Sequence, residues 1–327
     1  MNEVIFSKEI ESIIDVLDYS KLGKNVAIKV HFGEKGCTTF VNPEIIKKVY
    51  NKIISTGRKA SLVECNVLYR GERMIASTHM KLAKEHGFDF APIDILDGEL
   101  GDKSIEVNKC KLGGGIKKYD SMVVISHFKG HEMAGFGGAI KNIGMGLGSR
   151  GGKLDMHSKI CPSVNSRCIA CGLCIQNCGS DAIITEDKKA KILPEKCTGC
   201  AMCIAVCPNN AVVIPWGGAS STQLQERIAE YAKAVDELFK GKMIYLNVLE
   251  KITKNCDCMA INERPIMEDI GFLSGYDSVA IDKASLDLVN KNSEKFKKIN
   301  SVDKEFQITY AEKIGLGKKE YHLKTLK

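Results

Sequence analysis

The sequence predicts an α/β protein whose largely parallel sheet is interrupted by a small α+β domain. Strand-like and helix-like patterns alternate along roughly the first 130 residues, which is typical of a parallel sheet with crossover helices. Two dense runs of cysteine then break the pattern, and a long helix and a strand follow them. A chain of 327 residues is long enough for a host domain with a full core and a small second domain.

The predicted strands are short apolar runs rich in β-branched residues. They lie at residues 26–30, 60–65, 91–96, 122–126 and 242–248. The predicted helices have apolar residues at helical spacing and lie at 43–56, 72–86 and 222–239. Pro43 suits the first turn of its helix, and Gly57 and Gly87 suit the ends of the first two helices.

Each cysteine run has the spacing C-x2-C-x2-C-x3-C, and the second repeats the first 29 residues later. This spacing is that of the [4Fe–4S] ligands of bacterial ferredoxins, in which the fourth cysteine of each run binds the other cluster. We therefore expect two [4Fe–4S] clusters in a ferredoxin-like unit. The expected ligand sets are Cys168, Cys171, Cys174 and Cys207 for one cluster and Cys197, Cys200, Cys203 and Cys178 for the other.

Zinc and disulfides are the alternative interpretations of these cysteines. Zinc sites pair two C-x2-C halves across a longer gap and do not need a third closely spaced cysteine. Disulfides are disfavoured because the first residues contain acidic side chains and no apolar segment typical of an export signal. The first run departs from the pattern only at Gly179, where the second run has Pro208, and this removes no ligand.

The cysteine runs are predicted to form an insertion within the host domain. The expected division is 1–158 for the first part of the host, 159–215 for the insertion and 216–327 for the second part. Flexible joints at both ends, SKICPSVNS and PWGGASS, support it. Trp216, the only tryptophan, lies on the second joint and is expected to pack the insertion against the host.

Polar side chains follow four of the predicted strands. Because ligands bind beyond the carboxyl ends of parallel strands, we expect these groups to meet in one cleft. A lone histidine at a strand end is more often an ordinary core or surface residue, but four coinciding strand ends favour a site. The residues concerned are Lys29, His31, Glu64, Asn66, His127, Lys129, His131, Cys256 and Cys258.

A glycine-rich segment lies between the fourth predicted strand and the cysteine runs. Closely spaced glycines bring backbone N–H groups near a ligand, and such groups bind anions. We expect an anionic group there, bound with the help of Lys141, Asn142, Arg150 and Lys153, with His157 as a further proton donor or acceptor. The alternative is a loop without a ligand. A dinucleotide fingerprint is a weak interpretation, because no strand leads into Gly146 and no capped helix follows.

Cys256 and Cys258 are separated by one residue, so in an extended segment both point to the same side. They are expected to be soft metal ligands or a redox pair, or else ordinary reduced cysteines. Asp269 and Asp282 either orient a basic side chain, bind a metal, or cap a turn or helix. The remaining cysteines are interpreted as small buried apolar residues, namely Cys37, Cys65, Cys110 and Cys161.

Four motifs resemble the iron–sulfur-centre proteins of the domain-of-unknown-function 362 (DUF362) family. They are VECNVLYRGERM at 63–74, HFKGHEMAGFGGAIKNIGMGLGSRGGKLDMHS at 127–158, NCDC at 255–258 and DIGFLSGYDSVAIDKASLDLVN at 269–290. The resemblance extends over most of the chain and implies a host domain with an inserted two-[4Fe–4S] unit. It implies no substrate.

The favoured function is a cytoplasmic oxidoreductase that passes electrons between two clusters and an anionic substrate or cofactor. In this interpretation His127, His131, His157, Cys256 and Cys258 are the catalytic candidates. The alternatives are a non-catalytic electron carrier that docks a redox partner and a factor that delivers metal or clusters. Nucleic acid is not expected as a partner, because only 6% of residues are aromatic and no basic run is interleaved with them. A membrane is not expected either, since no apolar run approaches the length of a span.

Overall fold

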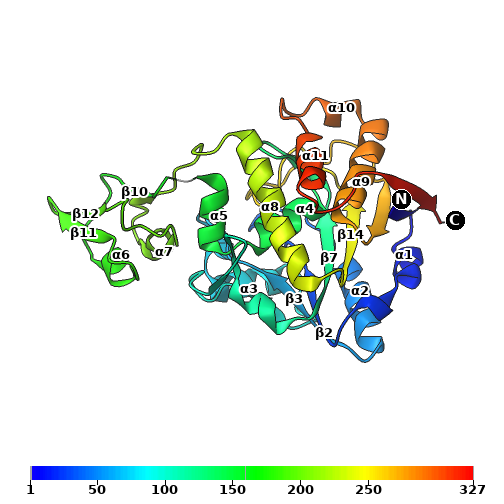
Figure 1. Cartoon of the computed structure of the whole chain (residues 1–327), viewed down its shortest axis with the longest axis horizontal. Helices are drawn as coiled ribbons and strands as arrows, with labels where there is room; N and C mark the ends of the chain where they lie inside the picture. Colours follow the sequence, from blue (N-terminus) through cyan, green and yellow to red (C-terminus); the bar gives the residue numbers. More distant parts are fainter. Residues whose placement is uncertain (1, 159, 327) are drawn as a thin grey trace.

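The computed structural model describes residues 2–158 and 160–326 and has the predicted fold class. Its centre is an eight-stranded, mostly parallel sheet (Figure 1). The strands, in their order across the sheet, are β16 (Tyr321–Thr325), β1 (Asn2–Ser7), β15 (Gly271–Gly275), β14 (Met243–Leu249), β7 (Ser121–His127), β2 (Asn25–Lys29), β3 (Lys59–Glu64) and β4 (Ile93–Ile95).

Only β15 runs against its neighbours; every other adjacent pair in this sheet is parallel. The register aligns the strand starts, with Val26 of β2 opposite both Ala60 of β3 and Ser121 of β7. Met122 in turn lies opposite Met243 of β14. The carboxyl ends of β3, β2, β7 and β14 therefore meet at one edge of the sheet, where ligands bind in parallel α/β proteins.

Helices cover both faces of the sheet and bury its alternating side chains. On one face Met122 and Val124 of β7 pack in a core formed with α4, α8, α9 and α11. On the other face Val123 and Ile125 pack in a core formed with α1, α2 and α3. The helices are α1 (Ile10–Val16), α2 (Pro43–Ser55), α3 (Ala76–Glu85), α4 (Ala139–Leu147), α5 (Arg150–His157), α8 (Ser221–Phe239), α9 (Ser278–Asn292), α10 (Glu294–Lys297) and α11 (Phe306–Lys313).

Short elements complete the host. They are two hairpins, β5 (Ser104–Val107) with β6 (Cys110–Gly113) and β8 (Lys129–His131) with β9 (Gly135–Gly137), and the 3-10 turns Tyr19–Lys21, Glu72–Met74 and Gly114–Lys118. Gly144 of α4 allows one tight helix contact, because a Cβ there would lie 2.2 Å from the carbonyl oxygen of Ile228 in α8.

The structure changes two of the predicted elements. The helix expected at 72–86 is divided into a 3-10 turn and α3, because Ile75 between them is extended. Within the 3-10 turn, Arg73 points inward to the buried carboxylates of Glu34 and Glu64. The strand expected at 91–96 is limited to Ile93–Ile95, which is all that pairs with β3.

The Cys-rich unit (residues 160–215) lies to one side of the host (Figure 1). Its strands pair with one another, β10 (Ser163–Val164) with β13 (Val212–Val213) and β11 (Ile183–Glu186) with β12 (Lys189–Ile192). Two short helices, α6 (Leu173–Gln176) and α7 (Met202–Val206), complete it. Strands before and after the unit belong to the same host sheet. Residues 1, 159 and 327, at ends of the predicted segments, lie outside the described residues.

Candidate functional site

A cavity of about 530 Å³ lies at the sheet edge where the four strand ends meet. It contains most of the residues that the sequence singled out, although these come from distant parts of the chain. Those that line it are His31, Glu64, His127, Lys129, His131, Lys141, Asn142, Lys153, His157, Cys256 and Cys258. Parallel strand order explains this convergence, since β2, β3, β7 and β14 deliver their following residues to one edge.

Three of the expected residues do not line the cavity. Lys29 is fully buried behind it, with its Nζ 3.0 Å from Oε1 of Glu64 and 2.8 Å from Oδ1 of Asn142. Asn66 donates from its side chain to the carbonyl of Gly98. Arg150 donates to the carbonyls of Leu100 and Met74. Asn66 and Arg150 therefore hold loops in place, and we do not include them in the site.

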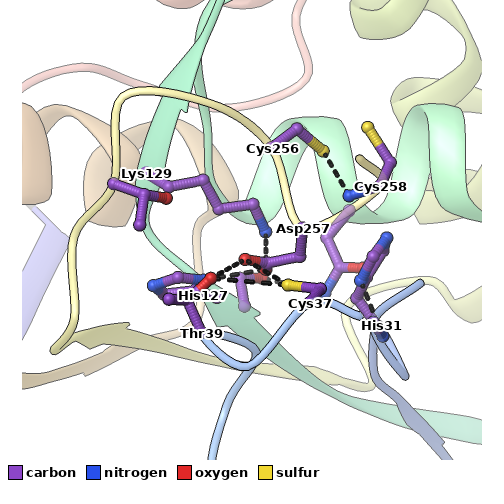
Figure 2. Close-up of polar contacts among 12 residues, drawn as sticks. His31, Cys37, Thr39, His127, Lys129, Cys256, Asp257 and Cys258 are labelled. Carbon is purple, nitrogen blue, oxygen red and sulfur yellow. Dashed lines mark hydrogen bonds and ion pairs between the residues drawn. The ribbon is translucent and has the colours of Figure 1, made fainter. Parts of the chain in front are cut away.

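The carboxylate of Asp257 is buried next to two residues that line the cavity, His127 and Lys129 (Figure 2). Its Oδ2 lies 2.8 Å from Nδ1 of His127 and 2.9 Å from Nζ of Lys129, and its Oδ1 accepts from Thr39 at 3.1 Å. Burial opposes ionisation of Asp257, but the neighbouring His127 and Lys129 hold its pKa well below the usual value. The carboxylate thus anchors the loop that carries both cysteines.

His127 is held on both sides of its ring. Nδ1 faces the carboxylate of Asp257, and Nε2 lies 2.9 Å from the carbonyl oxygen of Glu250. Both partners accept hydrogen bonds, so the ring makes both bonds only as a doubly protonated donor. This geometry leaves neither nitrogen free for a ligand. His127 is a positioning residue here, which differs from the proton-transfer role expected for it.

Cys256 and Cys258 lie in a turn, not in the extended segment that the sequence suggested. The N–H of Met259 donates to the carbonyl of Cys256 at 3.0 Å, and the N–H of Cys258 donates to the Cys256 sulfur at 3.3 Å. The turn still brings the two side chains together. A hydrogen bond from Cys258 lowers the pKa of Cys256 well below its usual value, against burial and with help from Lys141 and Lys129. The same hydrogen bond raises the pKa of Cys258, which favours a thiolate at Cys256 and a thiol at Cys258.

The cations around the cavity are unequally neutralised. Lys129 is paired with Asp257, and Arg73 is paired with Glu34 at 3.4 Å and Glu64 at 3.2 Å. Within residues 2–158 and 160–326, Lys141 and Lys153 form no ion pair, and Nζ of Lys153 donates to the carbonyl of Gly148. Two positive side chains therefore remain to balance an anionic group in the cavity.

Burial lowers the pKa of three histidines that line the cavity, His31, His131 and His157. The pKa of His157 falls to about 4, and those of His31 and His131 fall well below the ordinary value. Nδ1 of His131 accepts from the N–H groups of Met133 at 3.2 Å and Ala134 at 3.0 Å, so its proton lies on Nε2. The ring of His157 contacts the edge of Trp216, with the two ring centres 4.9 Å apart.

The glycine-rich segment is not a loop but forms β8, β9, α4 and α5. Asp282 caps α4 by accepting from the N–H groups of Ala139 at 2.7 Å and Ile140 at 2.9 Å. Ser149 caps α5 by accepting from Gly152 at 3.3 Å, so a capped helix does follow the glycine pattern. Side chains of the protein already occupy both helix N-termini.

Several minor expectations are resolved by their contacts. Asp282 caps a helix, and exposed Asp269 accepts from the N–H of Lys251 in a turn, so both make the capping contacts that the sequence left open as one of their roles. Cys37, Cys65 and Cys110 are buried as expected, whereas Cys161 is only half-buried. Trp216 lines the cavity beside Gly217 and remains 52% exposed.

Sequence reasoning missed Asp257, Tyr69 and Arg73. Asp257 lies between the two predicted cysteines, but a single aspartate in a polar turn usually indicates only a cap. Tyr69 and Arg73 line the cavity and are joined by a hydrogen bond of 2.5 Å from Nη2 of Arg73 to the tyrosine hydroxyl. Both lie within the motif VECNVLYRGERM, which was the available signal.

In the Cys-rich unit, the two cysteine runs fold alike. Positive φ values recur 29 residues apart, at Ala170 and Gly199, at Gly172 and Ala201, and at Asp181 and Asn210. The pattern of N–H···S bonds recurs too: Ala182 donates to Cys178 at 3.3 Å and Ala211 donates to Cys207 at 3.2 Å. A small cavity is lined by Cys168, Cys171, Cys174 and Cys207, three from the first run and one from the second.

Helix α5 lies between the Cys-rich unit and the main cavity. At Gly151 a Cβ would lie 3.1 Å from the carbonyl oxygen of Gly199 and 3.2 Å from Cα of Cys200. Lys153 and His157 of the same helix line the cavity. Leu68 contributes to both places, since it lines the cavity and packs in the apolar cluster of the Cys-rich unit.

Among residues 2–158 and 160–326, no group of three or more His, Cys, Asp or Glu side chains is arranged to hold a metal ion. In the same part of the chain, no helix combines the length and apolar character that crossing a bilayer requires.

The chain belongs to the family described as domain of unknown function (DUF362), whose model matches residues 26–287. No curated protein matches it. Among solved structures it is similar to the lactate racemase apoprotein from Thermoanaerobacterium thermosaccharolyticum, with 11% identity and a TM-score of 0.44 over 90% of this chain and 58% of that one. A protein from Thermotoga maritima gives 11% identity and a TM-score of 0.41 over 88% and 57%. The chain thus spans less than two thirds of either protein.

Proposed function

We propose that this member of the DUF362 family is an iron–sulfur oxidoreductase. In this proposal the Cys-rich unit holds two [4Fe–4S] clusters, and the main cavity binds the anionic substrate or cofactor with which they exchange electrons. The observation that carries the proposal is the position of α5, which contacts Cys200 on one side and lines the cavity on the other. An electron would cross about one helix diameter, roughly 10 Å.

The cysteines of the Cys-rich unit have the number and spacing that two [4Fe–4S] clusters require, although their side chains are not gathered around a metal position in the described residues. The first would be held by Cys168, Cys171, Cys174 and Cys207, which line one small cavity. The second would be held by the equivalent set, Cys197, Cys200, Cys203 and Cys178. Backbone N–H groups that donate to Cys168, Cys178 and Cys207 at 3.2–3.3 Å would stabilise thiolate charge and tune the potential. When bound, the clusters would supply single-electron transfer.

The cavity would bind its ligand through charge. Among the lysines that line the cavity, Lys141 and Lys153 form no ion pair within the described residues, and they would contact the anionic group. His131 would donate from Nε2, because its Nδ1 already accepts two backbone N–H groups. Its depressed pKa keeps the ring neutral, so it would serve as a hydrogen-bond donor to the ligand and not as a further cation.

An external electron donor would dock at the first cluster. Cys171 is exposed, and the neighbouring side chains Ile169 and Leu173 are 63% and 39% exposed. Exposed apolar side chains of this kind mark interaction surfaces. This end of the unit is suited to a redox partner protein, and the second cluster, with Cys200 next to α5, would lie nearer the cavity.

Cysteine variants test the proposal through iron content and the electron paramagnetic resonance of the reduced protein. Anaerobically purified wild-type protein should contain about eight irons per chain. Cys207→Ser should lose the signal of one cluster, because Cys207 is its only ligand from the second run. Cys161→Ser is the matched control and should keep both signals. Full iron in Cys207→Ser with unchanged spectra would contradict the ligand assignment, and iron-free wild-type protein would contradict the function.

A further inference from the structure

Three cysteines that no cluster assignment uses line the main cavity: Cys65, Cys256 and Cys258. Cys65 is fully buried and its thiol donates to the carbonyl of Leu147 at 3.5 Å, which leaves Cys256 and Cys258 as the pair considered for chemistry. Both line the cavity, and neither is in a disulfide in this structure. Their turn places the backbone N of Cys258 3.3 Å from the Cys256 sulfur, to which the Cys258 N–H donates a hydrogen bond. Two cysteines in direct contact, facing a space large enough for a small molecule, suit thiol–disulfide exchange.

Neighbouring residues hold the turn that carries Cys256 and Cys258, and both cysteines line the cavity. Asp257 points away from the cysteines into the buried contacts with His127 and Lys129 (Figure 2). On the other side, the N–H of Glu34 donates to the carbonyl of Asp257 at 3.0 Å. Asn255 is bound through its backbone and side chain to Glu263. The scaffold therefore holds the backbone of the turn, and the two sulfurs remain the reactive groups.

Charge distinguishes the two sulfurs. The backbone N–H of Cys258 donates to the Cys256 sulfur, and Lys141 and Lys129 further favour a thiolate at Cys256 by lowering its pKa. The thiolate is the nucleophile in disulfide exchange, and the neighbouring thiol then resolves the mixed disulfide. Lys141 also belongs to the unpaired cations of the cavity, so an anionic reactant would be drawn to the same place.

We infer that Cys256 and Cys258 form a dithiol/disulfide couple that reduces an anionic small-molecule disulfide in the main cavity. This inference rests on the proposed function, because the clusters would return the electrons. The Cys256 thiolate attacks one sulfur of the substrate, forms a mixed disulfide and releases the first thiolate. Cys258 loses its proton and attacks the Cys256 sulfur, which releases the second thiolate and closes a Cys256–Cys258 disulfide.

The Cys256–Cys258 disulfide must then be reduced to the dithiol, which requires two electrons and two protons. The two clusters, when bound, would supply one electron each. Overall one substrate disulfide, two electrons and two protons yield two product thiols. A one-electron donor protein at the exposed cluster would supply the electrons.

The chemical step is tested with one equivalent of 5,5′-dithiobis(2-nitrobenzoate), a disulfide with two carboxylates. The background variant Cys161→Ser removes the half-buried cysteine outside the site. The reaction of this variant should release two thionitrobenzoate ions per reacting chain. The mass of the protein should fall by two hydrogens, because the Cys256–Cys258 disulfide has formed. With Cys258→Ser added, one ion should be released and one adduct should remain on Cys256. With Cys256→Ser added instead, the fast release should disappear. A stable adduct in the background variant, or no adduct on Cys256 in the Cys258→Ser protein, would overturn the inference.

The preference for an anion is tested by comparing this reagent with neutral 2-hydroxyethyl disulfide. Lys141→Gln should slow the reaction with the neutral reagent about threefold, because the Cys256 thiolate becomes less favourable. It should slow the reaction with the anionic reagent about tenfold, because that reagent also loses its ion pair with Lys141. Lys81→Gln is the matched control, because its side chain is 78% exposed on α3, and it should change neither rate. Equal slowing of both reagents in Lys141→Gln would contradict an anionic substrate.

A third experiment measures whether electrons pass from the clusters to a disulfide through the cysteine pair. Its outcomes distinguish a failure of this inference from a failure of the proposed function. Protein reduced with titanium(III) citrate and freed of the reductant is mixed with oxidised glutathione, and cluster absorbance is followed. Wild-type clusters should reoxidise, and Cys256→Ser should slow this at least a hundredfold with unchanged iron. Equal rates in both proteins would refute the dithiol couple while leaving the clusters in place. Protein without iron would refute the proposed function, whereas the reaction with the thiol reagent would still report on the pair.

Discussion

The carboxylate of Asp257 lies 2.8 Å from Nδ1 of His127, although the two residues are 130 positions apart in the chain. This contact joins the end of β7 to the turn that carries Cys256 and Cys258. Lys129 completes the arrangement at 2.9 Å from the same oxygen. A buried charge network, and not the apolar core alone, therefore sets the position of the cysteine pair.

Replacing Asp257 with asparagine should strongly destabilise the protein. Asp257→Asn leaves His127 and Lys129 buried without the opposite charge, and breaking a buried pair from one side costs about 3–5 kcal/mol. Denaturant unfolding measures this loss. Asp269→Asn is the control, since that exposed carboxylate only accepts in a turn, and it should cost about 1 kcal/mol or less. Equal losses in the two variants would contradict the anchoring role.

The close approach of β8 to the cysteine turn should make Gly130 intolerant of any side chain. A Cβ at Gly130 would lie 2.2 Å from the carbonyl oxygen of Lys254, and the N–H of Gly130 donates to Thr253 at 2.9 Å. Gly130→Ala must displace the segment, with a loss of about 1–3 kcal/mol by analogy with overpacked cores.

The effect of Gly130→Ala should extend to the reactivity of Cys256 towards thiol reagents, because Lys254 lies two residues before it. Gly179→Ala is the matched control, because no atom lies within 4 Å of a Cβ at that position. Its free energy of unfolding should differ from that of wild type by about 0.5 kcal/mol or less. A Gly130→Ala protein with wild-type stability and Cys256 reactivity would show that the contact does not position the turn.

Much of this arrangement follows from the sequence, because its signals are local. Apolar β-branched runs predict β2, β3, β7 and β14, and parallel order then brings their ends together. The repeat of 29 residues predicts that the cysteine runs fold alike, and their positive φ values recur at that spacing. The assignment of the cysteines to clusters remains a prediction.

The errors concern residues whose partners are distant in the chain. Arg150 in a glycine-rich segment resembles an anion binder, but folding turns its guanidinium to the carbonyls of Leu100 and Met74. Asp257 resembles a turn cap, but its role depends on Thr39, which is 218 positions away. Local patterns carry no information on such pairings.

The buried imidazole of His79 should make the protein less stable in mild acid. Burial lowers its pKa from 6.5 to about 4 in the folded state. Between these values the unfolded chain binds more protons, so stability is present above pH 6.5 and is lost as the pH falls towards 4. The loss between pH 7 and pH 5 should be about 2 kcal/mol for this residue.

A non-titrating variant isolates this effect. His79→Phe keeps an aromatic ring against Phe32, whose ring centre lies 5.6 Å away, and removes the proton uptake. Urea midpoints at pH 7 and pH 5, measured on samples with equal iron content, should differ less in His79→Phe than in wild type. Parallel shifts in the two proteins would show that His79 does not account for the acid sensitivity.

The most direct test of the account is an anaerobic reductive titration that counts electrons per chain. Oxidised wild-type protein should take up about four electrons, one for each of two clusters and two for the Cys256–Cys258 disulfide. Cys256→Ser should take up about two, with the same iron content. Wild-type protein that takes up electrons without any change in iron–sulfur absorbance, or takes up none, would contradict the claim that clusters exchange electrons with the cavity.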